Sequence, residues 1–495
     1  LFRSCDRHLV TRNVCPVDRR SETMTLTDTT EMHMSSHATL TRTVAEWIVH
    51  QGATVLPDET NHHVRRMLLD HLAGVAASSV GEVSAAVGVH VARTYQGSTA
   101  TAIGHGRTSA LGAAVLNGTN GHGIESDEGY TPGSMHPTSV VFPAVFAVAQ
   151  ERGISGERVL RAAAIGMELA CRLADAGHPA TRNRHFHNTP VAGVFGAAAA
   201  VSVLLDLDSD GVANALGLAG SHAGGVFEFL GGSAEVKRFP PGKAARDGIT
   251  SADLAEAGLT GPTTILEGRD GYFAAFAGEE GTDWFADTVT RGLGAEGGLL
   301  LTYVKPYPCC RHLHGAIDAM LALRDEFDLD PDTIASIEVG TFAIATRHAG
   351  RVLDTVLQGQ LSLPYTVAVA ALTGSVTLTD FSETARRDRR TIALMDKVVV
   401  RLDEAADASY PKTGRPADVT VVTTDGARYQ HRVEQPYGEP TNPMSDADLE
   451  VKAYGLLEPV IGLAGAKTLV EACWNFDTLD FLDELDSAVR SAKPA

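Results

Sequence analysis

The feature that most constrains the fold is a change in hydrophobic periodicity along the chain. Between residues 40 and 300, apolar residues recur at the i, i+3 and i+4 positions of a helix, within stretches rich in Ala and Gly. Between residues 301 and 435, β-branched residues alternate with polar ones, as in KVVVRLD and ADVTVVTTDG. Helical spacing returns over residues 436–495. We therefore predict a mainly α protein, in which a large all-helical domain contains an inserted smaller α+β domain at residues 301–435.

Local signals refine this prediction. Ser155 and Glu157 predict the start of a helix that Gly177 ends, and Ser445 predicts the start of another. The Asp425-Gly426 pair predicts a hairpin turn between two strands of the α+β domain. Two helices are also expected within that domain, over residues 313–327 and 362–372.

Residues 1–39 differ from the rest of the chain. They are polar and charged, and they show neither helical spacing nor the apolar core of a signal peptide. We expect a disordered or spurious extension. Because Arg outnumbers the acidic residues in the first twenty positions, a transit peptide is the alternative.

Composition narrows the class of protein. The formal net charge of −20 disfavours nucleic acid and anionic lipid as partners, and any anionic substrate then requires a local cationic pocket. No apolar run approaches the ~20 residues of a membrane span. The six cysteines form no CxxC pair, which argues against a disulfide framework or a zinc ribbon. We expect a cytoplasmic protein without a membrane partner.

The first candidate cluster lies in the segment GHGIESDEGYTPGSMHPTS. It contains His122, Glu125, Asp127, Glu128 and His136 between two apolar stretches. Carboxylates and imidazoles among small residues are suited to acid–base chemistry. The alternative is a solvated acidic loop.

Two further clusters follow. His187 directly precedes an Asn-Thr-Pro run and an Ala-rich helix, where a helix N-terminus favours anions and lowers an imidazole pKa. The alternative for His187 is a capping or packing role. Lys237, Arg238, Lys243 and Arg246 surround a Pro-Pro-Gly turn, an arrangement suited to carboxylate binding. A basic surface patch is the alternative there.

The fourth cluster is the segment KPYPCCRHLHGAID, at the boundary between the two periodicities. Its Cys and His spacing matches no structural zinc site, so no metal is expected. A nucleophilic cysteine also lacks support, because no Asp or His partner is evident from the sequence. Its polar residues are Lys305, Cys309, Cys310, Arg311, His312 and His314.

Several cofactor and catalytic motifs are missing from the sequence. There is no Walker A loop, no GxGxxG between a strand and a helix, no GxSxG and no HExxH. No nucleotide, flavin or metal cofactor is therefore expected. His, Lys and carboxylate side chains alone can transfer protons, which permits elimination, decarboxylation or epimerisation next to a carboxylate.

Taken in order, several long stretches resemble the MmgE/PrpD family. The resemblance extends from about Thr41 to Ala488, nearly the whole chain after the unusual leader. Members of this family include dehydratases of 2-methylcitrate, decarboxylases of cis-aconitate and epimerases of iminodisuccinate. The matching stretches are NGTNGHGIESDE, HPTSVVFPAVFAVAQERGISGERVL, KRFPPGKAARDG, KPYPCCRHLHGAIDA and NPMSDADLEVK.

The resemblance implies a helical domain with an α+β lid, a homodimer, no cofactor and an active site between the domains. It implies that His136 and His187 are active-site histidines and that Lys237 holds a substrate carboxylate. Lys305 and His314 match pocket positions on the lid side. The family's DFDDT run is replaced here by the ESDEG run that begins at Glu125.

We therefore expect a lyase that acts on a small polycarboxylate, in the manner of a 2-methylcitrate dehydratase. Lys237, Lys305 and Arg238 would neutralise substrate carboxylates, which acidifies the neighbouring C–H bond. His136 and His187 would serve as base and acid in an order left open, and Glu125 or Asp127 would orient a histidine or bind substrate.

Three alternatives remain open. The same pocket could catalyse decarboxylation or epimerisation, or the chain could be a catalytically silent member that acts as a binding or assembly protein. Thr346 falls near the position that is Tyr in the decarboxylases, which argues weakly against decarboxylation.

Overall fold

The structure is a computed structural model that describes residues 39–229, 234–278, 282–294, 297–411, 413–476 and 478–492. From Thr39 onward the chain forms one compact unit. The extension expected at residues 1–39 lies outside the described residues, apart from Thr39. The Thr39 side chain accepts a hydrogen bond from the Arg42 backbone N–H and caps the first helix, so this residue belongs to the fold.

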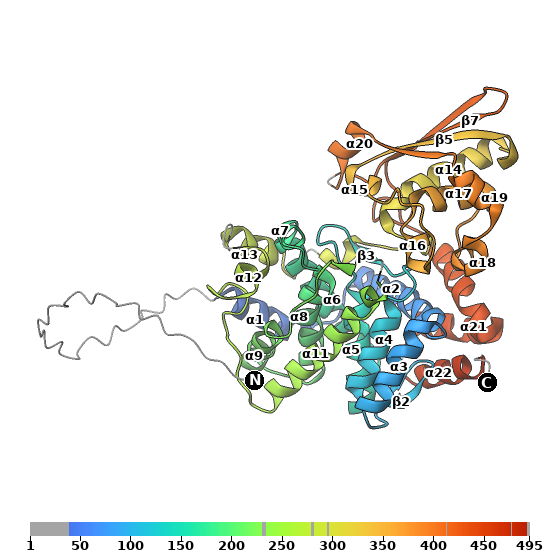
Figure 1. The fold of residues 1–495 in the computed structure, drawn as a ribbon. Helices are drawn as coiled ribbons and strands as arrows, with labels where there is room; N and C mark the ends of the chain where they lie inside the picture. The colour runs from blue at the N-terminus through green and yellow to red at the C-terminus, as the bar shows by residue number, and fades with distance from the viewer. Residues whose placement is uncertain are drawn as a thin grey trace, which may run out of the picture. The chain divides into compact units, whose positions relative to one another are not determined.

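Helices make up most of the described chain before residue 300 (Figure 1). They are α1 (Leu40–Gly52), α2 (Asp58–Ser78), α3 (Glu82–Thr94), α4 (Ala110–Gly121), α5 (Thr138–Arg152), α6 (Glu157–Gly177), α7 (Ala180–Asn183), α8 (Asn188–Leu204), α9 (Ser209–Gly220), α11 (Pro240–Glu256), α12 (Tyr272–Phe276) and α13 (Thr282–Thr290). Two short 3-10 helices, η1 (Glu235–Arg238) and η2 (Gly298–Leu301), and a hairpin of β1 (Ala100–Ala102) with β2 (Gly106–Thr108) accompany them.

Small residues explain how these helices pack. Every residue of α8 is buried, so this helix forms the centre of the layer rather than its surface. A Cβ atom at Gly166 of α6 would lie 2.5 Å from the Gly196 carbonyl oxygen of α8, and the reverse contact is equally short. Only glycine permits the two backbones to approach this closely.

A four-stranded sheet follows, in the order β6-β5-β7-β8. Its strands are β5 (Ile334–Thr341), β6 (Val398–Leu402), β7 (Ala417–Thr423) and β8 (Arg428–Val433). The β5–β6 pair is parallel and the other pairs are antiparallel. Gly426 has a positive φ of 89° in the turn between β7 and β8, which confirms the predicted hairpin.

Two helices, α14 (His314–Phe327) and α17 (Leu363–Thr373), lie against one face of this sheet (Figure 1). Both confirm predicted helices, and Ser362 caps α17 by accepting from the Tyr365 N–H. The remaining short helices are α15 (Ala343–Thr346), α16 (Val356–Gln360), α18 (Glu383–Arg386), α19 (Arg389–Met395), α20 (Glu404–Ser409), η3 (Arg311–Leu313), η4 (Pro331–Thr333) and η5 (Leu378–Phe381).

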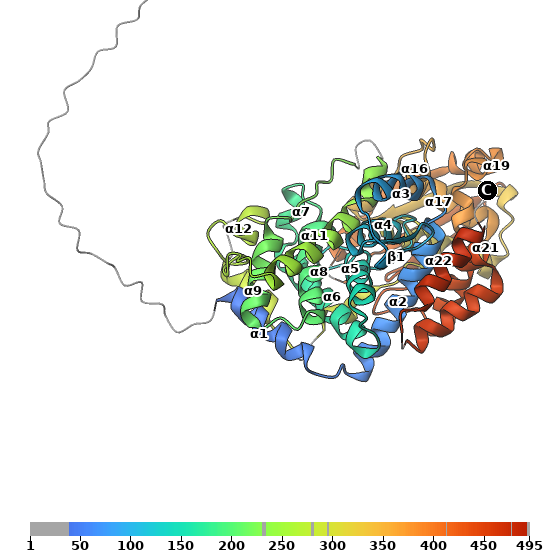
Figure 2. The same cartoon turned by 90° about the horizontal axis from the view of Figure 1, so that it is seen from below.

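The last described helices are α21 (Asp446–Trp474) and α22 (Phe481–Ala492). The backbone of α21 departs from helical geometry at Gly462, and the helix packs against α2 from the beginning of the described chain (Figure 2). Ser445 caps α21 by accepting from the Asp448 N–H, as predicted. The predicted cap at Ser155 is wrong. Gly156 occupies the position before α6, and no side chain caps the helix there.

The buried apolar residues form two cores. One draws on residues 40–304 together with 444–489, and the other on residues 309–421. The fold is therefore mainly helical, with a small sheet region in its C-terminal part. The inserted lid at residues 301–435 stays a prediction, because residues from Thr39 onward form a single compact unit.

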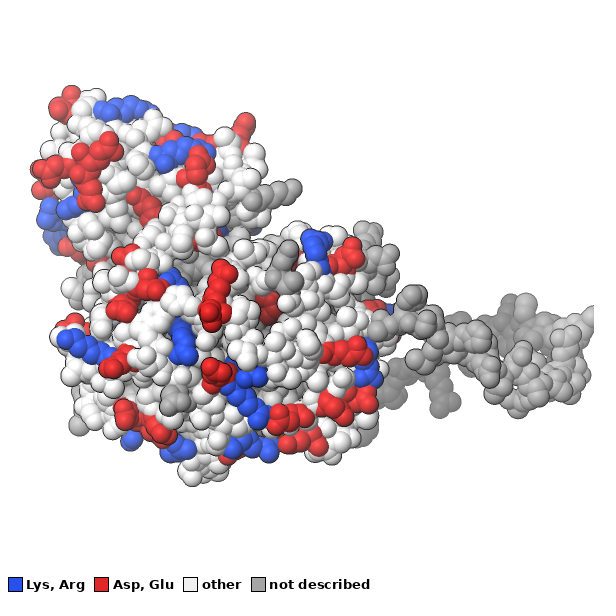
Figure 3. Space-filling model, turned by 180° about the vertical axis from the view of Figure 1, so that it is seen from behind, with Lys and Arg blue, Asp and Glu red and all other residues white. Residues whose placement is uncertain are grey.

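The surface and the helix lengths bear on possible partners. On the face shown in Figure 3, acidic and basic side chains of the described residues are interspersed, and no broad basic field covers it. Among the described helices, none is by itself long and apolar enough to cross a membrane. The pair α2 and α3, bent by 87°, meets the criteria of length and composition only when taken together.

Candidate active site

The loop after α4 is held in place by a short strand pair. His122 follows the last residue of α4, and the loop leads into β3 (Gly129–Tyr130), which pairs with β4 (Thr302–Tyr303). A Cβ atom at Gly129 would lie 2.3 Å from the Tyr303 hydroxyl oxygen, so glycine is required for this contact. The pairing brings Lys305, two residues beyond β4, to the loop.

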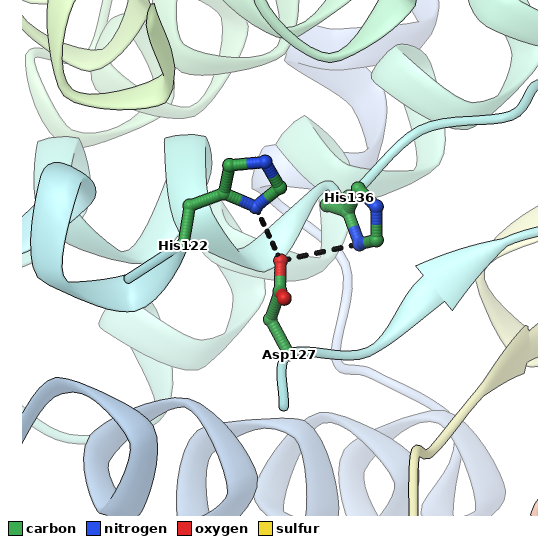
Figure 4. Close-up of side chains that lie close together, drawn as sticks. All are labelled: His122, Asp127 and His136. Atoms are coloured by element: carbon green, nitrogen blue, oxygen red, sulfur yellow. Dashed lines mark hydrogen bonds and ion pairs between the residues drawn. The ribbon is translucent and has the colours of Figure 1, made fainter. Parts of the chain in front are cut away.

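At the centre of the loop, one carboxylate contacts two imidazoles (Figure 4). The Oδ2 atom of Asp127 lies 2.6 Å from Nδ1 of His122 and 3.1 Å from Nδ1 of His136. His122 and Asp127 are fully buried, whereas the His136 side chain remains 17% exposed. We call His122, Asp127 and His136 the histidine–aspartate cluster.

Two lysines approach the same loop. The Lys305 ammonium lies 3.4 Å from Oδ1 of Asp127 and 3.8 Å from Oε2 of Glu125. Lys237, at the end of η1, forms an ion pair with the other oxygen of Glu125. Glu125 itself has a positive φ of 57°, which turns the backbone sharply between the two lysines. Two buried cations thus converge beside the histidine–aspartate cluster.

His187 completes the group from the start of α8. Its ring centroid lies 6.1 Å from that of His122, which in turn lies 4.9 Å from that of His136. The Thr189 hydroxyl accepts a hydrogen bond from the His136 backbone N–H at 3.2 Å, which ties the two segments together. The His187 Nδ1 and His122 Nε2 atoms are buried and have no hydrogen-bond partner among the described residues.

The charges in this site support one another. Burial opposes ionisation of Asp127, but His136, Lys305 and His122 together hold its pKa well below the usual value. Burial likewise opposes the charge on Lys305, but the Asp127 carboxylate raises the pKa of that ammonium. Burial and the charge of Lys305 lower the pKa of Lys237. The contact of Lys237 with Glu125 favours its ammonium form.

The imidazoles are shifted towards their neutral forms. Burial lowers the pKa of His122 to about 3, although Asp127 opposes the shift. Burial also lowers the pKa values of His136 and His187. By contrast, burial and the Asp127 charge raise the pKa of the Glu128 carboxyl to about 8, which favours its neutral, protonated form. Neutral imidazoles beside an ionised aspartate can accept protons near neutral pH.

Comparison with known proteins identifies the family. Residues 42–284 match the model of the MmgE/PrpD N-terminal domain, and residues 307–476 match that of the MmgE/PrpD C-terminal domain. The chain belongs to the MmgE/PrpD family.

Its curated MmgE/PrpD relatives include two kinds of lyase. A cis-aconitate decarboxylase-like protein of Aspergillus oryzae is 28% identical over 93% of this chain and 98% of its own length. The human cis-aconitate decarboxylase is 24% identical over 89% of this chain and 92% of its own length. The 2-methylcitrate dehydratase of Salmonella typhimurium is 27% identical over 48% of this chain and 51% of its own length.

Two other predicted residues, His314 from the MmgE/PrpD resemblance and Arg238 from the basic segment around the Pro-Pro-Gly turn, contact partners other than the histidine–aspartate cluster. His314 is buried at the start of α14, where Arg311 donates to its Nδ1 atom and its Nε2 atom lies 3.2 Å from the Cys309 carbonyl oxygen. Neither ring nitrogen is left for a ligand. Arg238 is buried next to Lys237 and approaches Glu235 at 3.1 Å, while its Nε and Nη2 atoms lack partners among the described residues.

Sequence reasoning alone misses several residues that shape the site. It includes His122 among the candidates for acid–base chemistry but gives it no individual role, although His122 contacts Asp127 directly. Gln360 donates to the carbonyl oxygens of Ile124 and Pro308, at 2.8 Å and 2.9 Å. Arg415 donates to the Thr131 hydroxyl at 2.8 Å. Gln360 and Arg415 lie more than 230 residues from the loop in sequence, and no local motif marks them.

The cluster also has the donor types of a metal site. Ligand atoms of His122, Asp127 and His136 lie within 4.8 Å of one another. The Nδ1 atom of His136 also makes a hydrogen bond to the Glu128 carbonyl oxygen, so this nitrogen carries a hydrogen. A nitrogen in that state cannot coordinate a metal, which leaves Nε2 as the only ligand atom that His136 could offer.

Proposed function

We propose that this chain is a cofactor-independent lyase that acts on a small di- or tricarboxylate and eliminates water, as a 2-methylcitrate dehydratase does. One observation carries the proposal. Two buried lysines converge on the loop that also holds the histidine–aspartate cluster, next to His187. An acidic protein that concentrates cations and neutral imidazoles at one buried site is suited to proton transfer on an anionic substrate.

In this mechanism, substrate carboxylates replace Glu125 and Asp127 as partners of the lysines. Lys237 and Lys305 then neutralise the carboxylates and stabilise the enolate-like state that forms when the adjacent proton is removed. His136 and His187 share the proton transfers, one as the base and the other as the acid that assists the leaving hydroxyl. Arg238, with two buried donor atoms free of partners among the described residues, would bind a further carboxylate.

Asp127 has a positioning role in this proposal. By accepting from both His122 and His136, it fixes the tautomer of each ring and stabilises the imidazolium form that arises during turnover. His122 would hold Asp127 through the same carboxylate oxygen that His136 contacts.

Decarboxylation of a cis-aconitate-like substrate is the second candidate. The extent of the sequence matches to its relatives favours this candidate. Relatives named as a cis-aconitate decarboxylase or a decarboxylase-like protein match over most of the chain, whereas the Salmonella typhimurium dehydratase matches over about half of it. In this reaction the lysines would hold the remaining carboxylates while carbon dioxide leaves. An imidazolium would then protonate the resulting carbanion.

The experiment that tests the proposal is an NMR assay of the purified chain with 2-methylcitrate, citrate, cis-aconitate and iminodisuccinate. Loss of water from 2-methylcitrate or citrate is the expected result. Loss of carbon dioxide from cis-aconitate would establish the second candidate instead, and inversion of iminodisuccinate would indicate an epimerase. If the folded protein turns over none of the four, the lyase proposal fails and a silent binding protein becomes the leading account.

A further inference from the structure

A cysteine and a histidine from separate segments meet at the edge of the proposed site. Cys310 directly precedes η3, and His348 lies just after α15. The Cys310 Sγ atom lies 3.7 Å from Nε2 of His348, within the range of a sulfur hydrogen bond. Both residues are only partly buried, and Cys310 forms no disulfide. The pair is therefore not fully enclosed in the core.

The surrounding contacts orient this pair. The Nδ1 atom of His348 lies 3.2 Å from the Leu361 carbonyl oxygen, so Nδ1 carries the hydrogen and Nε2 is free to accept the thiol proton. The Cys310 backbone N–H donates to the Gln360 carbonyl oxygen at 3.0 Å. Because the Gln360 side chain also binds the Ile124 carbonyl oxygen, the Cys310 segment is tied to the loop that carries Glu125 and Asp127.

The neighbouring groups favour ionisation of the thiol. His348, the His312 backbone N–H and Lys305 stabilise a thiolate, and they lower the pKa of Cys310 to about 6 although burial opposes the change. The Cys310 thiolate in turn raises the pKa of His348, against the effects of burial and of Arg347. The other charged or titratable groups that face this pair are Lys237, Cys309, His312, Tyr410 and Arg415.

The neighbouring cysteine provides an internal contrast. Cys309 is fully buried, and burial together with the adjacent Cys310 raises its pKa well above the usual value. Two adjacent thiols in one chain therefore differ in exposure, in partner and in the direction in which their pKa values are shifted. Any reaction that depends on the His348 contact should discriminate between them.

We propose that Cys310 and His348 form a thiolate–imidazolium dyad that is a covalent modification site for carboxylates carrying an electrophilic carbon. The choice of a carboxylate rests on the proposed function, because it assigns the nearby Lys237 and Lys305 to carboxylate binding. With iodoacetate, the thiolate attacks the methylene carbon, the S–C bond forms, the C–I bond breaks and iodide leaves. The thiol proton stays on His348, so no oxidant or further reactant is required.

The dyad should be evident from the rate of Cys310 alkylation at acidic pH. At pH 5.5, a thiol with a pKa of about 6 is ionised roughly 240-fold more than an ordinary thiol with a pKa of about 8.5. The intrinsic nucleophilicity of a thiolate falls as its pKa falls, here by roughly 13-fold. The net gain in alkylation rate over an ordinary thiol is about 20-fold at pH 5.5, and it nearly vanishes at pH 7.5.

The test is alkylation of the full-length protein by iodoacetate and by iodoacetamide between pH 5 and 9, with peptide mass spectrometry of each cysteine. We expect Cys310 to be alkylated with a midpoint near pH 6, and about 20-fold faster at pH 5.5 than free cysteine. The iodoacetate-to-iodoacetamide rate ratio should exceed that of free cysteine by about fivefold or more, since cations surround the thiol. His348→Gln should lower labelling at pH 5.5 by about 20-fold, and Cys309→Ser should leave it unchanged.

A midpoint near pH 8.5 in the wild-type protein, or equal labelling of Cys309 and Cys310, would overturn the dyad. A normal rate ratio with a midpoint near pH 6 would overturn the preference for carboxylates. The wild-type pH profile distinguishes these outcomes even if a variant fails to fold. Alkylation is measured by mass and not by turnover, so its outcome is independent of the substrate assay.

Discussion

Replacement of Asp127 by Asn is the perturbation that most directly probes the design of the site. The carboxylate accepts from His122 at 2.6 Å and from His136 at 3.1 Å, and its second oxygen faces Lys305 at 3.4 Å. The amide of Asn has nearly the same shape but no charge, and only its oxygen can accept a hydrogen bond. The substitution therefore removes the charge and leaves the packing almost intact.

The structure sets the expected magnitudes. Loss of one partner from a buried ion pair costs about 3–5 kcal/mol of folding free energy. The low end, about 3 kcal/mol, applies here because Glu125 remains 3.8 Å from the Lys305 ammonium. The effect on turnover should be larger. An imidazole that loses its orienting carboxylate also loses its fixed tautomer and the charge that stabilises its protonated form, which costs up to about 10⁴-fold in kcat. We expect a loss of about 10²–10⁴-fold.

The assay compares kcat, with whichever carboxylate the wild-type protein turns over, and urea unfolding of both proteins. Asp486→Asn is the matched control. Asp486 is also buried, and it accepts from the Gly104 and Gly106 N–H groups at 2.9 Å and 3.0 Å, away from the proposed site. The control should lose stability without losing kcat. A stable Asp127→Asn variant with kcat within about threefold of wild type would refute the positioning role.

Three further predictions follow from the same geometry. Lys237→Ala should lower kcat/KM by about ten- to a hundredfold, because a charge-assisted bond to a carboxylate is lost. Arg161→Ala should change it little, since among the described residues Arg161 donates to the Gly52 carbonyl oxygen and to no group of the site; equal effects would remove Lys237 from the site. Dialysis against a chelator should leave turnover unchanged, and a loss that zinc or iron restores would contradict this expectation. The pKa of Glu128 is about 8 in the folded protein, above its ordinary value of 4.5 in an unfolded chain. Ionisation of Glu128 therefore favours the unfolded chain, and this group destabilises the fold increasingly as pH rises from about 4.5 to 8. Urea unfolding should therefore show that the free energy of unfolding of Glu128→Gln, relative to wild type, rises by up to about 1.4 kcal/mol per pH unit over that range. A difference that does not depend on pH would show that the pKa of Glu128 is not raised.

Much of the fold was predictable because its determinants are local. Alternation of β-branched residues identified the strands of the sheet, and the Asp425-Gly426 pair identified the β7–β8 turn. Ser445 was a correct helix cap, whereas Ser155 was not. The residue directly before α6 is Gly156, with a positive φ of 65°, so the chain turns there without a side-chain cap.

The site was predictable only in part, because its contacts join distant segments. His136, His187, Lys237 and Lys305 could be proposed from residue type and from family resemblance, and the structure brings them to one loop region. The partner of Cys310 could not be found in this way. His348 lies 38 residues away and reaches the thiol only because α15 and the Cys310 segment pack together.

The most direct test of the central claim follows deuterium placed on the substrate carbon next to the carboxylate. If His136 and His187 move the proton of that carbon, the wild-type protein should release this deuterium into water as the substrate is turned over, which NMR can follow. His136→Ala and His187→Ala, each with wild-type folding, should lower the rate of release by about 10²–10⁴-fold. Turnover that leaves the deuterium in place, or release at the wild-type rate in both variants, would contradict the account.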